Sequence, residues 1–354
     1  MTRFFSKKYE QLTPYTPGEQ PKERQYIKLN TNESPFPPSP RAQYRAKEAA
    51  EKLELYSDPQ CRELNAIAGE KLGLDPDQIL FTNGSDEILN FAFMAFCDDA
   101  HPAVFPDITY GFYPVFAQLN GVPYETVPLK EDFSIDPQDY IGIGKTIFIA
   151  NPNAPTGLAL SLKDIEAIVA GNPDNVVVID EAYVDFGAES ALKLIPKYDN
   201  LLVTQTFSKS RSMAGARLGF GAGSEALIRD LNTIKYSTNP YNVNRMTMAA
   251  GIGALEDEDY FLDNCRKIMA TRTATTNALR EMGFQLNDSL TNFLFVRHPK
   301  VSGGDMYRKL RDRGFLVRHF DAPRLADYNR ITVGSDEQMQ ALLGALREIL
   351  EESL

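Results

Sequence analysis

The sequence predicts an α/β protein whose large domain is built on a mostly parallel sheet and is followed by a smaller α+β domain. Short, nearly continuous apolar runs alternate with helix-like segments through much of the chain, which is typical of a parallel sheet covered on both faces. The 354 residues also exceed the usual size of a single domain. We expect an N-terminal arm at residues 1–40, a large domain at 41–245, and a small domain at 246–354 that packs with part of the arm.

The first elements are predicted to be an extended arm, a helix and a strand. Prolines between positions 14 and 40 are too frequent for a helix and too closely spaced for a central strand. From Arg41 to Gly73 apolar residues recur at helical spacing, and Gly73 is a suitable helix end. The run at residues 79–82 predicts a strand, a glycine turn follows, and the stretch at 88–96 predicts a helix.

The remaining elements follow from the same patterns. Further strands of the large domain are expected at 103–105, 146–150, 176–179, 201–204 and 218–222, separated mostly by helix-like segments such as 162–170. After about residue 245 we expect a long helical stretch to Leu279, strands at 293–296, 316–317 and 331–333, and a closing helix from Asp336.

Charge and cysteine content exclude several classes of protein. The net charge of -11 argues against a general binder of nucleic acid or anionic membranes. Cys61, Cys97 and Cys265 are far apart and have no CxxC spacing, so we expect neither disulfides nor a metal site. Residues 1–10 lack the apolar core of a signal peptide, and no stretch has the length of a membrane span. We therefore expect a soluble, cytoplasmic protein.

A first candidate motif is the segment Thr82-Asn83-Gly84-Ser85-Asp86-Glu87, a glycine turn that opens a helix directly after a strand. Such a turn presents backbone N–H groups and the positive end of the helix dipole, which together bind phosphate. Many such turns are only helix caps, and Ser85 or Asp86 could serve as the cap. This motif alone leaves both interpretations open.

A second candidate is Asp180, at the end of the predicted strand Val176-Val177-Val178-Ile179. Open α/β sheets bind ligands at the carboxyl ends of their strands, which favours a functional carboxylate. The alternative, that Asp180 caps the following segment, is equally compatible with the sequence. A Walker-type magnesium site is excluded because no GxxxxGK[ST] loop is present.

A third candidate is Lys209 in Thr206-Phe207-Ser208-Lys209-Ser210, just after another predicted strand. A lysine in a short polar segment is usually solvated. Here two hydroxyls precede it and Arg217 follows eight residues later, so one phosphate could be bound beside the lysine amine. This grouping favours an amine nucleophile that attacks a carbonyl group.

These motifs, with Asn151-Pro152-Asn153-Ala154-Pro155-Thr156-Gly157 between them, resemble the fold-type I aminotransferases that depend on pyridoxal phosphate (PLP). The chain is most similar to the histidinol-phosphate aminotransferase family. The resemblance runs along nearly the whole chain, through the segments at 29–35, 109–113, 240–244, 316–318 and 330–334. It implies transfer of an amino group between a small anionic amine and 2-oxoglutarate, in histidine biosynthesis.

The resemblance implies how the cofactor is held. Lys209 would bind it covalently, Asp180 would hold its ring nitrogen, Tyr183 would donate to its ring oxygen, and Tyr110 would stack on its face. A further group would surround the cofactor phosphate: Gly84, Ser85, Asp86, Thr206, Ser208 and Arg217. Tyr56 resembles the tyrosine that reaches this phosphate from the neighbouring subunit, so a homodimer with shared active sites is expected.

One departure from the family stands beside the ring oxygen. The usual Asn-Asn-Pro-Thr-Gly is here Asn153-Ala154-Pro155-Thr156-Gly157, so Ala154 replaces the asparagine that bonds this oxygen. Asn153 is retained as a candidate cofactor ligand. The loss of one hydrogen bond could raise the pKa of the cofactor-bound lysine nitrogen.

Substrate-binding residues are also implied by the resemblance: Tyr15, Asn32, Tyr241, Asn242, Arg318 and Arg330. The two arginines would bind the anionic end of the substrate, since a guanidinium presents a fork of donors. Either could instead form a surface ion pair. The alternative functions are a threonine-phosphate decarboxylase, a broad aromatic or other amino-acid aminotransferase and, in another class, a regulatory protein with this fold; the retained Lys209 and the short N-terminal arm disfavour the last.

Overall fold

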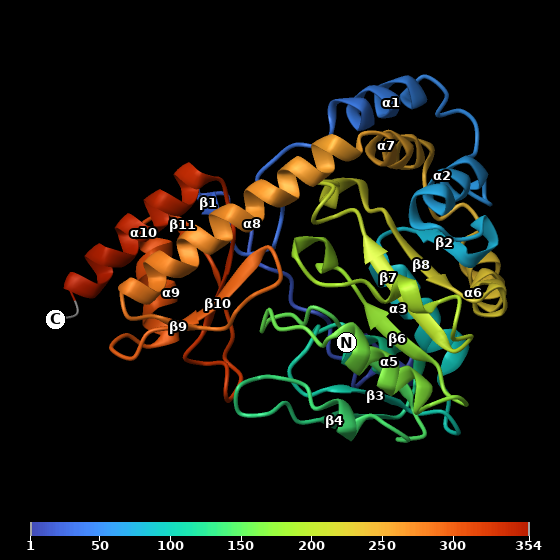
Figure 1. Ribbon diagram of the computed structural model, residues 1–354, viewed down its shortest axis with the longest axis horizontal. Helices are drawn as coiled ribbons and strands as arrows, with labels where there is room; N and C mark the ends of the chain where they lie inside the picture. Colours follow the sequence, from blue (N-terminus) through green and yellow to red (C-terminus); the bar gives the residue numbers. More distant parts are fainter. Residues whose placement is uncertain (1, 353–354) are drawn as a thin grey trace.

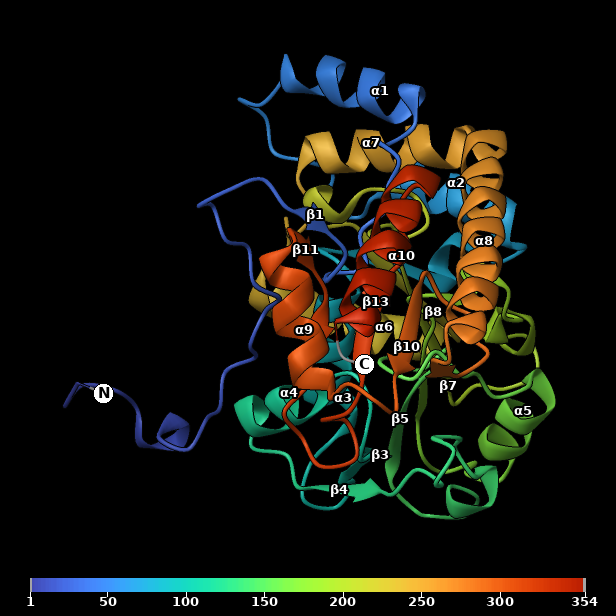
Figure 2. The ribbon, with the colours of Figure 1, turned by 90° about the vertical axis from the view of Figure 1, so that its left-hand side faces the viewer.

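The computed structural model describes residues 2–352, which form a large and a small domain joined through a long helix (Figure 1). The first residues form an arm that extends away from the body of the chain before it returns to the small domain (Figure 2). Most of the arm has no regular structure, apart from a short 3-10 turn at Lys7–Tyr9 and the strand β1 (Ile27–Lys28). The predicted extended arm is therefore observed.

A seven-stranded sheet, in the order β2-β8-β7-β6-β5-β3-β4, forms the centre of the large domain. Its strands are β2 (Ile79–Thr82), β3 (Ala103–Pro106), β4 (Tyr124–Val127), β5 (Thr146–Ala150), β6 (Val177–Asp180), β7 (Leu201–Thr206) and β8 (Gly219–Gly223). The strands from β7 to β4 are mutually parallel, whereas β8 runs antiparallel to both of its neighbours. The prediction of a mostly parallel sheet is confirmed.

Helices cover both faces of this sheet. The helices of the large domain are α1 (Pro40–Ala50), α2 (Arg62–Leu72), α3 (Ser85–Phe96), α4 (Tyr113–Asn120), α5 (Leu162–Ala170), α6 (Glu225–Thr238) and α7 (Arg245–Glu256), of which α1 packs on α7. Successive residues of β5 illustrate the arrangement, because Ile147 and Ile149 belong to one buried apolar cluster and Phe148 to another. This alternation follows from the two-residue period of a strand. It explains why the central strands are apolar throughout.

The small domain combines a sheet with three helices. Its antiparallel sheet has the order β12-β13-β10-β9, with β9 (Gln285–Leu286), β10 (Phe293–Arg297), β12 (Arg318–His319) and β13 (Asn329–Thr332). The helices are α8 (Glu258–Glu281), α9 (Gly303–Asp312) and α10 (Asp336–Glu351). Strand β1 of the arm pairs in parallel with β11 (Phe315–Leu316), so the arm is tied to the small domain.

Several elements differ from the sequence prediction. The strand expected at 316–317 is two short strands, β11 and β12, on either side of Val317, and α9 was not predicted. The single helix expected at 41–73 is two helices, because the segment at 51–61 contains Pro59 and ends at Cys61 in a left-handed conformation with φ 49°. The helical stretch after 245 is likewise broken, at Asp257. Strand β4 was not predicted, because its side chains are mostly exposed at the sheet edge and carry no apolar pattern.

Helix α7 determines where we place the domain boundary. Its residues Ala250, Ile252 and Leu255 belong to the buried cluster of the large domain, and it packs along α1. We therefore propose a boundary near Asp257 rather than at 245.

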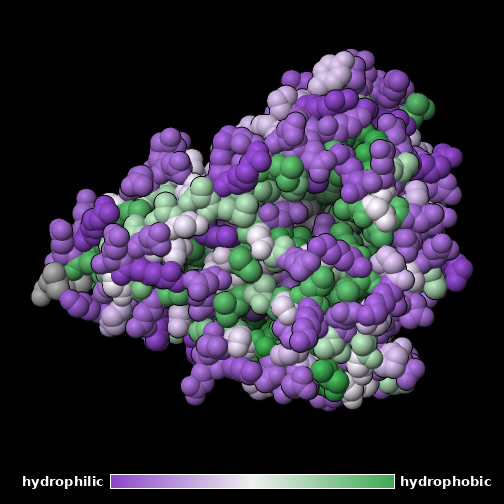
Figure 3. All heavy atoms as spheres, in the orientation of Figure 1, coloured by the Kyte–Doolittle hydropathy of each residue, from purple (hydrophilic) through white to green (hydrophobic). Residues whose placement is uncertain are grey.

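The face of the molecule seen in Figure 3 is largely polar. Figure 3 shows hydrophilic residues over most of one face, with hydrophobic residues gathered near the middle of the view, where the two domains meet. Within residues 2–352, no helix is both long enough and apolar enough to cross a membrane.

Candidate active site

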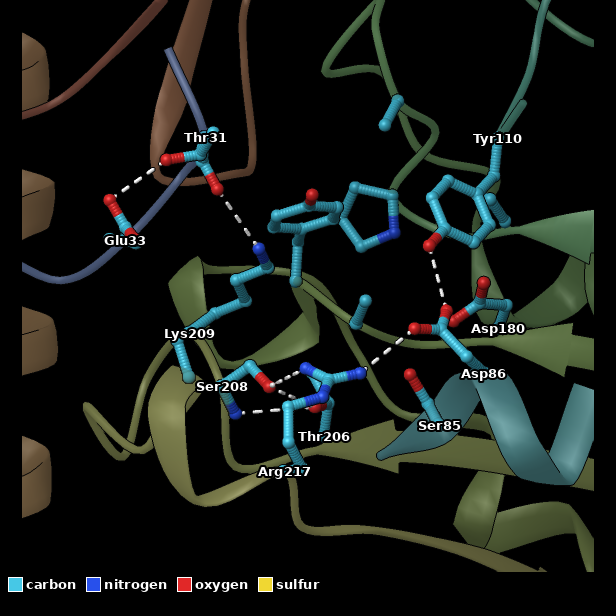
Figure 4. A pocket seen from close by; sticks show the side chains of 16 residues that line it. Thr31, Glu33, Ser85, Asp86, Tyr110, Asp180, Thr206, Ser208, Lys209 and Arg217 are labelled. Atoms are coloured by element: carbon cyan, nitrogen blue, oxygen red, sulfur yellow. Dashed lines mark hydrogen bonds and ion pairs between the residues drawn. The ribbon is translucent and has the colours of Figure 1, made fainter. Parts of the chain in front are cut away.

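A cavity of about 280 Å³ lies where β6 and β7 end and α3 begins (Figure 4). Its walls include the side chains that the three sequence motifs singled out, among them Ser85, Asp180 and Lys209. Parallel strands end at the same edge of the sheet, so motifs more than a hundred residues apart meet here. The structure thus brings residues from all three motifs into one cavity.

Asp180 is the last residue of β6 and is only 4% exposed. Its Oδ2 accepts a hydrogen bond from the hydroxyl of Tyr113 at 3.0 Å, whereas its Oδ1 has no partner within the described residues. Burial, which penalises the charged carboxylate, raises the pKa of Asp180 to about 7. A buried carboxylate oxygen without a partner is costly, and a cationic N–H group in the cavity would satisfy it.

Lys209 follows β7 in a short turn, and its amine faces the same cavity. Its Nζ donates a hydrogen bond to the backbone oxygen of Thr31, in the arm, at 3.2 Å. Burial lowers the pKa of Lys209 to about 8, and the nearby positive charge of Arg330 contributes to this lowering. The lowered pKa leaves a usable fraction of the amine neutral near pH 7, as a nucleophile requires.

The first turn of α3 lines another side of the cavity. Gly84 is the N-cap, with φ 81°, and no side chain of the described residues caps the helix. The alternative that Ser85 or Asp86 serves only as the cap is therefore excluded. Uncapped amides at a helix N-terminus bind anions. Strand β8 approaches this turn so closely that a Cβ atom at Gly219 would lie 2.4 Å from the Ser85 nitrogen.

Donors from the loop after β7 face this helix end. Arg217, with φ 56°, lies beside Ser208, which also bonds the hydroxyl of Thr206 at 3.0 Å. Arg217 also forms an ion pair of 2.9 Å with Asp86. The guanidinium, two hydroxyls and helix amides thus surround one end of the cavity, as the sequence predicted for a phosphate site.

Two tyrosines also line the cavity. Tyr110 borders the cavity, and its hydroxyl donates to Asp86 Oδ1 at 2.7 Å (Figure 4). Tyr183 borders it as well and accepts a hydrogen bond of 2.9 Å from Asn32 Nδ2. Ala154 also lines the cavity, and its methyl group offers no hydrogen bond. The sequence did not identify Tyr113, the first residue of α4, because a buried tyrosine resembles an ordinary core aromatic.

A second cavity of about 710 Å³ adjoins the first and shares Lys209 and Tyr183 with it. Its other walls come from the arm, including Tyr15, and from the small domain, including Arg318 and Arg330. Desolvation lowers the pKa of Arg330, and its buried Nε has no partner within the described residues. Arg318 donates to the backbone oxygens of residues 16 and 17 in the arm. The two arginines make this cavity suitable for an anion.

Five predicted site residues do not line these cavities within the described chain. One is Gly84, the N-cap of α3, which directly precedes the lining residue Ser85. The amide of Asn153 is occupied by Thr109 Oγ1 and by the backbone of Ile108, at 2.8 and 3.0 Å. The other three are Tyr56, Tyr241 and Asn242. Tyr56 is 79% exposed and stacks on Tyr241 with ring centroids 4.5 Å apart.

No cluster of metal-binding side chains is found within the described part of the chain. The cysteines at 61, 97 and 265 are all free thiols. The groups that the site itself offers for chemistry are an amine, carboxylates, hydroxyls and guanidinium groups.

Comparison with known proteins places the chain in a family. The sequence profile of the family "Aminotransferase class I and II" matches residues 24–346. The chain belongs to this family. This aminotransferase is 49% identical to the histidinol-phosphate aminotransferase of Brachyspira hyodysenteriae over 353 residues, covering 99% of this chain and 100% of that protein. The same enzyme of Aromatoleum aromaticum is 49% identical over 355 residues, with 99% and 100% covered.

A solved structure shows the same fold. The histidinol-phosphate aminotransferase of Sinorhizobium meliloti, in complex with pyridoxal-5'-phosphate, superimposes with a TM-score of 0.85. It is 24% identical, and the match covers 94% of this aminotransferase and 93% of that chain. The predicted fold and the predicted enzyme class are both confirmed.

Proposed function

We propose that this aminotransferase moves the amino group of histidinol phosphate to 2-oxoglutarate, in histidine biosynthesis, with PLP bound to Lys209. The main support for the proposal is that Lys209 and Asp180, whose Oδ1 has no partner in the described chain, line the same cavity. A second cavity that adjoins it is lined by Arg318 and Arg330. Full-length relatives that are 49% identical carry the name histidinol-phosphate aminotransferase.

The residues of the smaller cavity fit PLP. Asp180 Oδ1 would accept a hydrogen bond from the protonated ring nitrogen, which would satisfy its missing bond. The amides of the first α3 turn, Ser208 and Arg217 would hold the phosphate. Tyr110 would lie against the ring, and Tyr183 would donate to the ring oxygen.

When bound, PLP supplies an electron sink that is conjugated to the substrate amine. The chain supplies the proton transfer and the positioning. Lys209 Nζ would take a proton from the substrate carbon and return it to the cofactor side, because its pKa of about 8 suits both directions near neutral pH. Asp180 keeps the sink effective, since a carboxylate beside the ring nitrogen favours its protonated form.

The larger cavity would select the substrate by charge. The Nε of Arg330 is buried and unpartnered, so an anionic group would compensate a donor that nothing else in the described chain satisfies. Arg318 and Tyr15 border the same space. A phosphate of histidinol phosphate and a carboxylate of 2-oxoglutarate can use the same guanidinium fork in turn.

A homodimer is part of the proposal. Tyr56 and Tyr241 form an exposed aromatic pair outside both cavities of their own chain. In a symmetric dimer such a pair would be buried, and Tyr56 would reach the phosphate end of the partner's cavity. We place the enzyme in the cytoplasm, where three free cysteines are compatible with a reducing environment.

An assay of the purified protein with histidinol phosphate and 2-oxoglutarate tests this function. We expect glutamate to form with histidinol phosphate and at least about tenfold more slowly with unphosphorylated histidinol, because the lost phosphate contact is charge-assisted. Carbon dioxide release from threonine phosphate, without glutamate formation from histidinol phosphate, would favour the decarboxylase instead.

A further inference from the structure

Asn32 of the arm is held between the two domains by a closed set of hydrogen bonds. It is 1% exposed and has φ 56°, a left-handed conformation that asparagine tolerates better than most residues. Its backbone N donates to Thr332 Oγ1 at 2.9 Å, and Thr332 Oγ1 donates back to Asn32 Oδ1 at 3.0 Å. Its Nδ2 donates to the hydroxyl of Tyr183 at 2.9 Å.

These bonds fix the direction of each proton. A hydroxyl has a single proton. In the structure the hydroxyl of Thr332 accepts from the backbone N of Asn32 and donates its proton to Asn32 Oδ1. The amide oxygen therefore faces Thr332, and the amide NH₂ faces Tyr183. Tyr183 accepts this bond, so its own proton points away from Asn32.

The hydroxyl proton of Tyr183 can find an acceptor in the cavity that Tyr183 lines. No other hydrogen bond of this hydroxyl is found among the described residues. Of the charged groups nearby, Lys209 and Arg330 are donors, and the carboxylates of Asp180 and Asp86 are bonded to Tyr113, Tyr110 and Arg217 instead. Tyr183 also keeps its proton, because burial raises its pKa. On the family pattern a second donor would stand at Ala154, which here has only a methyl group.

We propose that Asn32, oriented by Thr332, is a positioning residue that makes Tyr183 a donor to the ring oxygen of the cofactor. The inference rests on the proposed function, because the cofactor supplies the acceptor. Tyr183 is then the one side-chain donor to the ring oxygen, whereas an asparagine at position 154 would provide a second. The bond also depends on β13 of the small domain, so the arm and both domains contribute to it.

The consequence is a shift in the pH at which the Lys209-bound cofactor loses its proton. A donor to the ring oxygen stabilises its negative charge, which weakens the hold of that oxygen on the neighbouring proton. Loss of the donor therefore raises the titration midpoint. A hydrogen bond to a charged group corresponds to about one pH unit.

The test is a double-mutant cycle read by the visible absorption of the cofactor-loaded protein across pH. Asn32→Asp keeps the size and the left-handed conformation, but its carboxylate accepts the Tyr183 proton instead of donating. We expect its upward shift to be about one pH unit larger in the Tyr183 background than in the Tyr183→Phe background. The negative charge added by Asn32→Asp is present in both backgrounds, so its effect on the midpoint cancels when the two shifts are compared.

Equal shifts in the two backgrounds would overturn the proposal. Asn32→Gly, which is neutral and also accepts a positive φ, provides a second cycle if the aspartate variant does not fold. It should raise the midpoint with Tyr183 present and leave it unchanged with phenylalanine. If the wild-type protein showed no titrating visible band, the binding of PLP to Lys209 would be wrong, and the failure would lie with the proposed function.

Discussion

The hydroxyl of Tyr113 donates a hydrogen bond to Asp180 Oδ2 at 3.0 Å, and the other oxygen of this buried carboxylate has no partner within the described residues. Oδ2 is thus satisfied by the protein, whereas Oδ1 is buried without a partner in a residue that lines the cavity. The arrangement holds Asp180 in place for a ligand that brings an N–H group. It also makes the stability of the cofactor-free protein depend on pH.

The first prediction concerns this pH dependence. In the cofactor-free protein the pKa of Asp180 is about 7, against an ordinary value of 3.8. A raised folded-state pKa means that stability is full below the unfolded-state pKa and is lost as pH rises through the folded-state value. The free energy of unfolding should fall by about 2 kcal/mol more in the wild type than in Asp180→Asn between about pH 5.5 and about pH 8.

Urea denaturation of the cofactor-free proteins at the two pH values measures this difference. Glu181 is also buried with a pKa of about 7, but it is present in both proteins and cancels. An identical pH dependence in the two proteins would show that Asp180 is charged in the cofactor-free fold.

A second prediction concerns the close approach of β8 to α3. In Gly219→Ala the new methyl group would lie 2.4 Å from Ser85 N and 2.7 Å from the carbonyl carbon of Gly84, so the backbone has to move. We expect a loss of about 1–3 kcal/mol in stability and an affinity for PLP at least about tenfold weaker, since misplaced amides bind the phosphate poorly. Gly215→Ala is the matched control, because no atom of the described residues lies within 4 Å of its new methyl group.

Titration of PLP into the cofactor-free proteins gives the two affinities. If Gly219→Ala and Gly215→Ala bound PLP equally well, the first turn of α3 would not hold the phosphate.

A third prediction tests substrate recognition by Arg330. Replacement with methionine removes a buried donor whose Nε has no partner among the described residues. Since charge-assisted bonds contribute about 1.5–3 kcal/mol, kcat/KM for histidinol phosphate should fall by roughly 10- to 100-fold. Arg297→Met, at an exposed arginine of the neighbouring strand β10, should leave steady-state kinetics unchanged. Similar kinetics for both variants would remove Arg330 from the substrate site.

A fourth prediction concerns Ala154. An asparagine at this position would restore a second donor beside the ring oxygen, so Ala154→Asn should lower the pH midpoint of the visible absorption by up to about one unit. Ala154→Val adds volume without a donor and should not lower the midpoint. A midpoint that does not fall in the asparagine variant would mean that the position 154 side chain does not reach the ring oxygen.

Much of the fold could be predicted, because central strands are apolar on both faces and so remain recognisable without their neighbours. Edge strand β4 could not, since its first three residues are exposed and only Val127 packs against a core cluster. The break between α1 and α2 was also missed, because the periodicity of apolar residues resumes after Pro59 and masks the interruption.

Site residues that belong to contiguous sequence motifs could be predicted, whereas residues that contact the site from distant segments of the chain could not. Asp180 is the last residue of β6 and Lys209 lies three residues after the end of β7, which indicates their position at the sheet edge. Tyr113 and the backbone of Thr31 contact these residues from distant segments, and no local pattern indicates that. Asn32 was predicted to bind substrate; it does border the larger cavity, but its amide is bonded to Tyr183.

The most direct test of the central claim is borohydride reduction of the PLP-loaded protein, followed by mass spectrometry of its peptides. We predict that the reduced cofactor is found on Lys209 and that the visible absorption band is absent in Lys209→Ala, which should still bind PLP non-covalently. Reduced cofactor on another lysine, or an unchanged band in the alanine variant, would contradict the account.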